Sequence, residues 1–302
     1  MAGLPGPRVL CSSGTLTEPF DVTVDAAPAL VHAGRMHSAE HGVGYTQTEV
    51  RGHIGIITLT HDAKRNALCQ ALIDQLIADL AGFEQRRVRA VVLRARAGAK
   101  VWSAGHDVSE LPRSGRDPLA YNDPLEQGVR AVRKFPAPVL AMIDASVWGG
   151  AVELASSCDL LIGTRNATFA LTPARLGVPY NPAGILRIMS SIGASLVVRE
   201  LFFTARPLSA ERALSLGVLN HLVEPEALEP FTLELAGEIA QNSPLSIQVI
   251  KEQIRLLSDA TSLSPGTFER IQGLRRRVYD SQDYREGITA FLEKRKPTWS
   301  GE

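Results

Sequence analysis

Two short segments rich in small and polar residues carry the groups best suited to chemistry. The first reads WSAGHDVSEL at 102–111, where small residues lead through His106 toward an expected helix. The second reads SVWGGAVELASSCDL at 146–160, with Gly149 and Gly150 at an expected strand-to-helix junction. Small residues let a ligand approach backbone N–H groups, and the start of a helix favours an anion. Each motif alone is common and often structural, but one N–H group from each would together form an oxyanion hole.

The elements that must position these segments begin with an expected β-hairpin at 45–61, where YTQTEVRG alternates and HIGIITLTH is rich in β-branched residues. A helical spacing of apolar residues follows at 72–83, and RAVVLRA at 89–95 predicts a buried strand. Further strands are expected at 138–147, 158–164 and 167–172, with a short helix that opens at the glycine pair.

Strand patterns nearly vanish after about residue 182. Helical patterns replace them at 182–203, 209–216, 226–241, 244–258, 265–280 and 283–296, and Pro297 is expected to end the last helix. Strands threaded with helices and followed by a helical run predict an α/β fold. We predict a disordered N-terminal extension at 1–44, an α/β core at 45–205 and a C-terminal helical subdomain at 206–302.

Composition and charge exclude several classes of protein. Among 302 residues, 32 Lys and Arg balance 32 Asp and Glu, so no overall charge favours nucleic acid or an anionic membrane. The three cysteines show no metal-binding or disulfide spacing, which indicates a reducing compartment. No apolar run is long enough to span a membrane, and no secretory signal pattern is present. We therefore expect a cytoplasmic protein without a metal site.

Four segments, in order, resemble those of the crotonase, or enoyl-CoA hydratase/isomerase, superfamily. They are KRNAL at 64–68, SAGHD at 103–107, GGAVEL at 149–154 and REGITAFLEKRKP at 285–297. The resemblance covers the chain from about Tyr45 to Trp299. It implies a spiral of ββα units, an acyl-CoA thioester substrate, and a homotrimer or a homohexamer of two trimers.

Within the superfamily, GHD at 105–107 and FALTPARLGVPYNPAGI at 169–185 are similar to the methylmalonyl-CoA decarboxylase branch. That resemblance implies conversion of methylmalonyl-CoA to propionyl-CoA and CO₂ with no cofactor. By the same resemblance, the backbone N–H groups of His106 and Gly150 bind the thioester oxygen, and Tyr180 faces the substrate carboxylate. It also implies contacts to the CoA part of the substrate from Lys64, Arg65, Ala67, Ala104, Asp107, Thr172 and Lys294. In a trimer, Lys294 would act on the CoA site of a neighbouring subunit.

The absence of a second carboxylate of the hydratase pair supports the same reaction. Adding water across a double bond typically needs two carboxylates that share acid and base duties. Glu153 matches the first of these in a hydratase, but Pro173 stands where the second is found. Decarboxylation needs no base, because loss of CO₂ leaves an enolate that two preorganised donors stabilise. Glu153 is then either a structural carboxylate, turned away and paired within its helix, or a direct participant.

Several alternatives remain open at this stage. The His106 imidazole is either a general acid for the enolate carbon or a side chain that holds its loop. Lys64, Arg65 and Lys294 meet CoA phosphates or are simply solvated, and the Arg275–Arg277 triplet is expected to be a helix face or subunit contact rather than a nucleic-acid patch. The competing functions are another crotonase-type hydratase or isomerase, and a non-catalytic CoA-binding protein with RNA contact.

Overall fold

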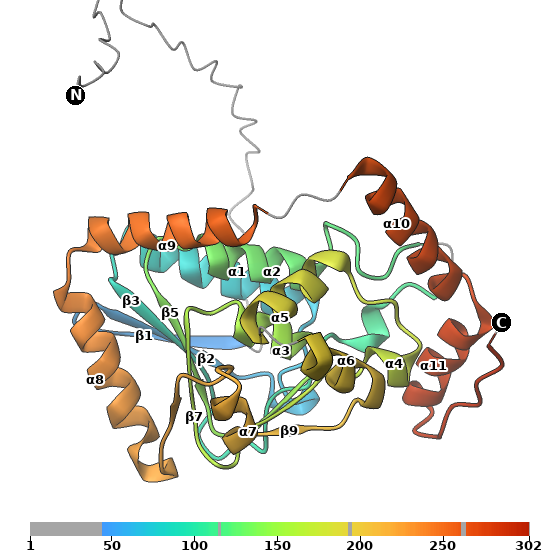
Figure 1. The fold of residues 1–302 in the computed structure, drawn as a ribbon. Coiled ribbons are helices and arrows are strands. Elements are labelled where there is room, and N and C mark those ends of the chain that lie inside the picture. The colour runs from blue at the N-terminus through green and yellow to red at the C-terminus, as the bar shows by residue number, and fades with distance from the viewer. Residues whose placement is uncertain (1–43, 114–115, 193–194, 261–263, 302) are drawn as a thin grey trace, which may run out of the picture. The chain divides into compact units, whose positions relative to one another are not determined.

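The computed structural model describes residues 44–113, 116–192, 195–260 and 264–301. The predicted disordered extension at 1–44 lies outside these residues except for Gly44, and the division of the remainder at residue 205 stays a prediction. The α/β class is confirmed: strands alternate with helices and a run of helices follows (Figure 1). In the part that the structure describes, no helix is both long and apolar enough to cross a membrane.

The larger of two sheets has six strands in the order β1-β2-β3-β5-β7-β10. Its strands are β1 (Thr46–Arg51), β2 (Ile54–Leu59), β3 (Ala90–Ala95), β5 (Val139–Ile143), β7 (Leu160–Gly163) and β10 (His221–Leu222). The predicted hairpin is the antiparallel β1–β2 pair, with Thr46 opposite Leu59. All other neighbours in this sheet are parallel, as expected for strands joined through helices.

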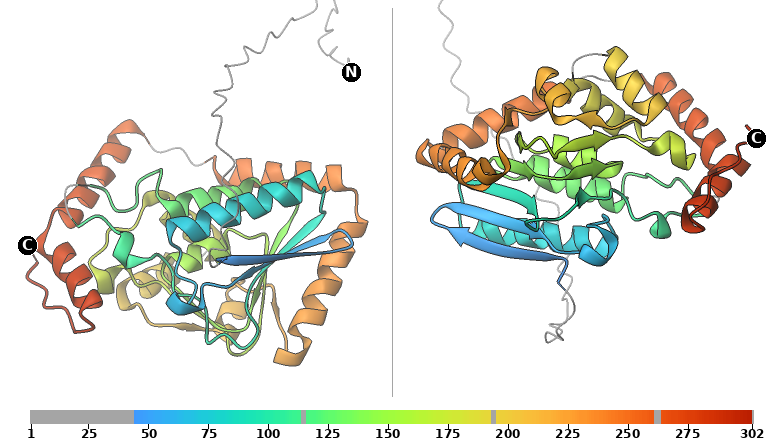
Figure 2. Two further views of the ribbon diagram at one scale, coloured as in Figure 1. Left: turned by 180° about the vertical axis from the view of Figure 1, so that it is seen from behind. Right: turned by 90° about the horizontal axis from the view of Figure 1, so that it is seen from below.

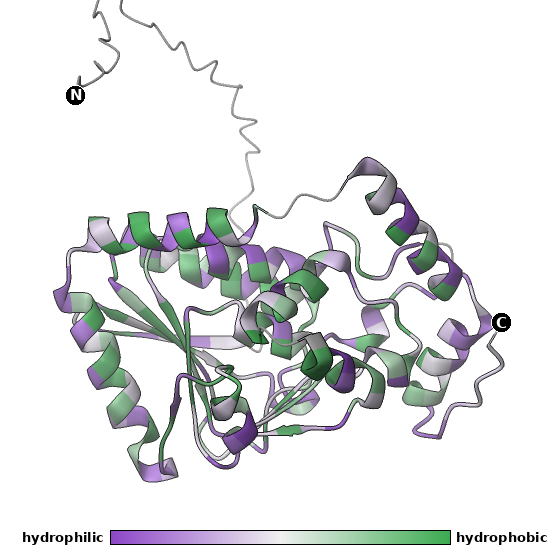
Figure 3. Cartoon of the chain, viewed as in Figure 1, coloured by the Kyte–Doolittle hydropathy of each residue, from purple (hydrophilic) through white to green (hydrophobic). Residues whose placement is uncertain are grey.

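Apolar residues cover both faces of the inner strands of this sheet, which the hydropathy colouring shows in green, whereas β1 is mostly polar and exposed (Figure 3). Alternate residues such as Ile57 and Leu93 pack in one core with α1 (Gln70–Gln85) and α2 (Pro124–Lys134). Their neighbours such as Val92 pack on the opposite face with α8 (Leu228–Gln241). A strand buried on both sides carries few polar residues, which explains why RAVVLRA reads as a continuous apolar run.

The smaller sheet has four short strands in the order β4-β6-β8-β9, and the SAGHD and WGGAVEL segments lie at the ends of two of them. They are β4 (Val101–Ser103), β6 (Ser146–Trp148), β8 (Thr168–Ala170) and β9 (Leu208–Ser209). Because β4 and β6 pair in parallel, the chain leaves both strands at the same edge of the sheet. The sheet therefore brings the SAGHD and WGGAVEL segments side by side.

The C-terminal helices follow the predicted series, with a few changes. They are α5 (Pro182–Ile192), α6 (Ser195–Thr204), α7 (Ala210–Ser215), α8, α9 (Pro244–Ser258), α10 (Pro265–Tyr279) and α11 (Gln282–Leu292). The views in Figure 2 place α10 and α11 together at the end of the molecule that holds the C-terminus. Serines 243, 264 and 281 cap α9, α10 and α11, each accepting a hydrogen bond from the backbone N–H three residues on.

Three predicted elements were wrong in extent. The strand expected at 138–147 is two strands, because a bend at Asp144 takes the chain from the larger sheet to the smaller. The helix expected at 182–203 is α5 and α6, and the last helix ends at Leu292 rather than at Pro297. The backbone of Lys294 has a φ of +57°, which no longer belongs to a right-handed helix.

Candidate active site

A cavity of about 600 Å³ lies where the two suggestive segments meet α4 (Pro173–Leu176) and the C-terminal helix. All but one of the predicted site residues line it: Lys64, Arg65, Ala67, Ala104, His106, Asp107, Gly150, Thr172 and Tyr180. Lys294 does not, and its side chain is exposed. Its neighbour Arg295 lines the cavity instead, paired with Glu286 and Glu293.

The KRNAL turn runs beside the SAGHD segment and is joined to it by backbone hydrogen bonds. Leu68 N–H donates to the Gly105 carbonyl at 2.8 Å, and Ala104 N–H donates to the Arg65 carbonyl at 2.9 Å. Buried Asn66 adds a side-chain hydrogen bond to the Trp102 carbonyl at 2.9 Å. The sequence-predicted CoA turn and the first oxyanion segment are thus one continuous wall.

Glycine is required where the SAGHD and WGGAVEL segments cross. Gly105 has a φ of +83°, and a Cβ placed there would lie 2.4 Å from the Trp148 carbonyl oxygen and 3.0 Å from the Gly150 nitrogen. Gly149 has a φ of +53°, and it precedes α3 (Gly150–Ser156). Gly105 is therefore needed both for conformation and for space, and Gly149 for conformation.

The backbone N–H groups of His106 and Gly150 form a pair of free donors at the cavity. Neither donates a hydrogen bond to any residue that the structure describes. They lie close together, since a Cβ built on Gly150 would be 3.6 Å from the His106 nitrogen. Two adjacent, fixed donors without an acceptor are the arrangement that binds an oxygen bearing developing negative charge.

The His106 side chain contacts an acceptor at each of its two ring nitrogens. Its Nε2 lies 2.8 Å from Asp123 Oδ2, and its Nδ1 lies 3.2 Å from the Asp107 carbonyl. Both partners are acceptors, so a doubly protonated ring satisfies both. Burial opposes the charged ring, but the hydrogen bond and charge of Asp123 outweigh it and raise the pKa of His106 above 6.5. Asp123 also caps α2, so the ring ties the oxyanion loop to that helix.

Asp107 is the carboxylate that lines the cavity, and its hydrogen-bonding capacity is occupied. It accepts from Lys64 Nζ at 2.7 Å, and from the Ser109 backbone N–H and hydroxyl at 3.0 and 2.6 Å. Burial alone would raise its pKa, but these partners together lower it below the ordinary value. Asp107 therefore remains an anion that fixes the loop and orients Lys64.

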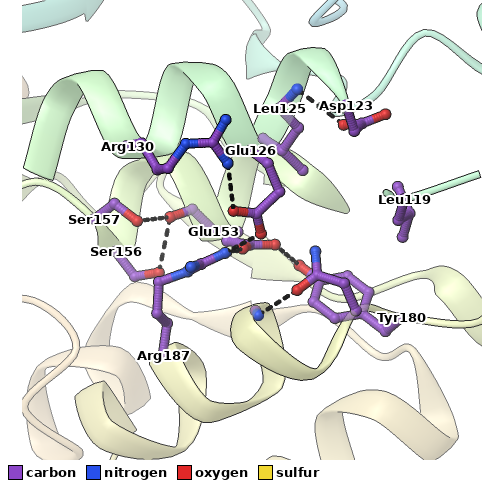
Figure 4. Close-up of polar contacts among 12 residues, drawn as sticks. Leu119, Asp123, Leu125, Glu126, Arg130, Glu153, Ser156, Ser157, Tyr180 and Arg187 are labelled. Carbon is purple, nitrogen blue, oxygen red and sulfur yellow. Dashed lines mark hydrogen bonds and ion pairs between the residues drawn. The ribbon is translucent and has the colours of Figure 1, made fainter. Parts of the chain in front are cut away.

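Tyr180 lines the cavity and stands in front of Glu153, which does not (Figure 4). Its hydroxyl donates to Glu153 Oε2 at 2.7 Å, and the Glu153 side chain is fully buried. Burial and the adjacent carboxylate hold the pKa of Tyr180 well above its ordinary value, so the hydroxyl keeps its proton. The hydroxyl of Thr172, also in the cavity wall, has no hydrogen-bond partner among the described residues.

Glu153 belongs to a buried ionic cluster behind Tyr180. Arg187 of α5 binds both Glu153 and Glu126 of α2, and its Nε lies 3.1 Å from Glu153 Oε1. Arg130 approaches Glu126 from the other side at 3.7 Å. Burial raises the pKa of Glu153, whereas the charge and hydrogen bonds of Arg187 and the Tyr180 hydroxyl lower it in part. The interpretation of Glu153 as a structural carboxylate is supported, but the predicted pairing within its own helix is wrong, because its partners are Arg187 of α5 and Tyr180.

Comparison with known proteins identifies the family. A family model described as enoyl-CoA hydratase/isomerase matches residues 49–302. The chain belongs to the enoyl-CoA hydratase/isomerase family. It is 49% identical to methylmalonyl-CoA decarboxylase of Escherichia coli K12 over 257 residues, which cover 85% of this chain and 98% of that protein.

Solved structures of the family agree with the computed fold. A methylmalonyl-CoA decarboxylase complexed with 2S-carboxypropyl-CoA superposes with a TM-score of 0.84 at 48% identity, covering 86% of this chain and all of that one. A carnitinyl-CoA hydratase from Mycobacterium avium superposes with a TM-score of 0.70 at 28% identity, covering 86% and 100%. The crotonase resemblance seen in the sequence is thereby confirmed.

Among the described residues, the cavity wall of this enoyl-CoA hydratase/isomerase family member has no pair of carboxylates. Pro173, at the start of α4, is buried and lines the cavity. Of the described residues that line the cavity, Asp107 alone has a carboxylate, and Glu153 lies behind Tyr180. In the same described residues, no group of three or more His, Cys, Asp or Glu side chains could hold a metal ion.

Sequence reasoning missed three contributors to the site. Asp123 holds His106, and Arg187 holds Glu153, but each partner is remote in the chain and no local pattern marks the pairing. Gly184 was also missed: a Cβ there would lie 2.6 Å from both Glu153 Oε2 and Tyr180 Cε1. An ionisable residue on an otherwise apolar helix face was the available signal for Arg187.

Proposed function

We propose that this protein decarboxylates methylmalonyl-CoA to propionyl-CoA and CO₂ through a thioester enolate. The similar Escherichia coli protein bears the name methylmalonyl-CoA decarboxylase. The observation that carries the proposal is the cavity itself, whose described residues offer two free N–H donors and a tyrosine hydroxyl but no paired carboxylates. That set of groups suits stabilisation of an enolate and not the addition of water.

The backbone N–H groups of His106 and Gly150 bind the thioester oxygen in this mechanism. As the bond between C2 and the carboxylate carbon breaks, its electron pair moves toward the thioester carbonyl and its oxygen becomes an anion. Each fixed donor is worth about 10²–10³ in rate. A proton then adds to C2 and gives propionyl-CoA.

Tyr180 positions the carboxylate that is lost. Rotation of its hydroxyl hydrogen about the Cζ–Oη bond transfers the hydrogen bond from Glu153 to the substrate. Held out of the thioester plane, the breaking C–C bond overlaps the carbonyl π system, so positioning contributes directly to the rate. The Thr172 hydroxyl is a second donor available at the same wall.

The His106 side chain holds the loop in this proposal, and water supplies the proton to C2. The contacts of both ring nitrogens with Asp123 and with the Asp107 carbonyl support this choice over a general acid. No cofactor takes part, because the thioester itself accepts the electron pair.

The remaining predicted residues bind the CoA part of the substrate. Lys64 and Arg65 contact the CoA phosphates, while Ala67, Ala104 and Thr172 line the path of the CoA chain.

Lys294, exposed and outside the cavity of its own chain, acts on a neighbouring subunit in a homotrimer or homohexamer. Large apolar side chains exposed on α6 and α9, such as Phe203 and Leu257, support an assembly of this kind. We place the enzyme in the cytoplasm, without a nucleic-acid or membrane partner.

The test is release of CO₂ and propionyl-CoA from methylmalonyl-CoA, with malonyl-CoA and crotonyl-CoA in parallel, in the presence of a metal chelator and avidin. The proposal expects propionyl-CoA formation with little hydration of crotonyl-CoA. Hydration without decarboxylation would favour the hydratase alternative. A salt-sensitive shift of RNA without turnover would favour the non-catalytic one.

A further inference from the structure

The cluster behind Tyr180 sets the electrical environment of the acyl end of the cavity. The Tyr180 side chain lines the cavity and contacts the Glu153 carboxylate behind it, with 2.7 Å between Oη and Oε2 (Figure 4). A buried carboxylate without a counter-charge is costly, and it repels any anion nearby. Glu153 therefore poses a problem for a substrate that carries a carboxylate of its own.

Arg187 contacts Glu153 and neutralises its negative charge. The charged groups around Glu153 are Arg187 from α5 and Glu126 from α2, and Arg130 lies beyond Glu126; uncharged Tyr180 packs from the segment before α5. Two carboxylates and two guanidinium groups give the cluster no net charge. Without Arg187 it carries one uncompensated negative charge, and Glu153 keeps no cation in contact.

We propose that Arg187 is a positioning residue that makes the cavity accept an anionic acyl group, because it neutralises Glu153 and so releases the Tyr180 proton to the substrate. A phenol donates one hydrogen bond, and two carboxylates compete for it. Glu153 keeps the Arg187 Nε at 3.1 Å after the tyrosine turns, whereas the substrate carboxylate has no such partner. The proton therefore goes to the substrate. This inference rests on the proposed decarboxylation of a carboxyacyl thioester.

The size of the effect follows from Coulomb's law. A substrate carboxylate hydrogen-bonded to Tyr180 lies about 5 Å from Glu153, and two unit charges at that separation with an effective dielectric near 20 change a dissociation constant on the order of 100-fold. A neutral acyl group is not subject to this penalty. The ratio of affinities for an anionic and a neutral ligand therefore isolates the role of Arg187.

The experiment measures dissociation constants calorimetrically for 2-carboxypropyl-CoA, which is anionic at its acyl end, and for propionyl-CoA, which is neutral there. Wild-type protein is compared with Arg187→Gln, with the double variant Glu153→Gln and Arg187→Gln, and with Arg94→Gln. Arg94 is a matched control because it pairs with Glu229 away from the cavity. Each protein is measured from about pH 6 to about pH 9, a range in which an uncompensated buried carboxylate titrates.

The proposal expects Arg187→Gln to weaken 2-carboxypropyl-CoA on the order of 100-fold at the alkaline end and less at the acid end, where Glu153 takes up a proton. Propionyl-CoA binding changes little, the double variant recovers the wild-type ratio, and Arg94→Gln behaves as wild type. Equal loss of both ligands at every pH, or no recovery in the double variant, overturns it.

Two further arrangements keep the result interpretable. If Arg187→Gln does not fold, Arg187→Lys and the double variant replace it; both are expected to keep the wild-type ratio, and a fall in either overturns the proposal. Because these ligands are bound and not turned over, a protein that shows the expected ratios but releases no CO₂ from methylmalonyl-CoA contradicts the proposed function alone.

Discussion

Gly105→Ala is the substitution that most directly perturbs the pair of backbone donors. The added Cβ would lie 2.4 Å from the Trp148 carbonyl oxygen, which is 0.6 Å inside the 3.0 Å limit for such contacts, and 3.0 Å from the Gly150 nitrogen. The two oxyanion segments must therefore separate at the point where their N–H groups converge. Loss of one such donor typically costs about 10²–10³ in rate, and we expect kcat to fall by that factor.

Gly52→Ala supplies the matched control for this substitution. Gly52 also has a positive φ, of +60°, in the β1–β2 turn, but a Cβ there meets nothing within 4 Å. Both variants carry the backbone cost of alanine in the left-handed region, about 1 kcal/mol of unfolding free energy. Only Gly105→Ala displaces the donors.

The assay is initial-rate CO₂ release across methylmalonyl-CoA concentrations, with urea unfolding of both variants measured in parallel. We expect a low kcat for Gly105→Ala with KM changed by a smaller factor, since the lost interaction is made mainly in the transition state. Equal kcat values for the two glycine variants would refute the assignment of the His106 and Gly150 N–H groups.

Three other predictions concern side chains. Tyr180→Phe should reduce kcat by about 10- to 100-fold without weakening propionyl-CoA as an inhibitor, because propionyl-CoA has no carboxylate for the Tyr180 hydroxyl to bind; unchanged decarboxylation would exclude that role. Asp123→Asn should lower the His106 pKa, measured by NMR titration. Because the pKa of His106 is raised in the folded protein, the His106–Asp123 pair of the wild type stabilises the fold below about pH 6.5, and this stabilisation is lost as pH rises through the folded pKa. The free energy of unfolding of Asp123→Asn, measured with urea, should therefore lack this dependence on pH. Lys64→Ala should raise KM roughly threefold to tenfold at constant kcat, since its side chain is half exposed and its contacts are screened; a fall in kcat would instead assign it to the chemistry.

The sequence predicted those parts of the site that depend on local chemistry. Glycine pairs, small residues and strand-to-helix junctions carry their own geometry, so the SAGHD and GGAVEL segments were recognised before any fold was known. Their meeting depends on β4 and β6 pairing in parallel, and β4 is only three residues long, too short for its periodicity to stand out. The same limit hid the division of the strand at 138–147.

Ion pairs between residues far apart in the chain could not be predicted from the sequence. Arg187 reaches Glu153 across 34 positions and Glu126 across 61, and nothing local to any of them indicates the others. The helix α2, which carries Glu126 and the Asp123 cap, was not predicted at all. The absence of a second carboxylate in the sequence favours a structural role for Glu153. Its neutralisation by Arg187 becomes visible only once α2, α3 and α5 are packed together.

In the proposed mechanism the reaction passes through an enolate formed by loss of CO₂. Methylmalonyl-CoA labelled with ¹³C in its free carboxylate, incubated with the enzyme in deuterium oxide, tests it most directly by mass spectrometry. We predict one labelled CO₂ for each propionyl-CoA, which carries one deuterium at C2. Absence of labelled CO₂, together with hydration of crotonyl-CoA by the same preparation, would contradict the account.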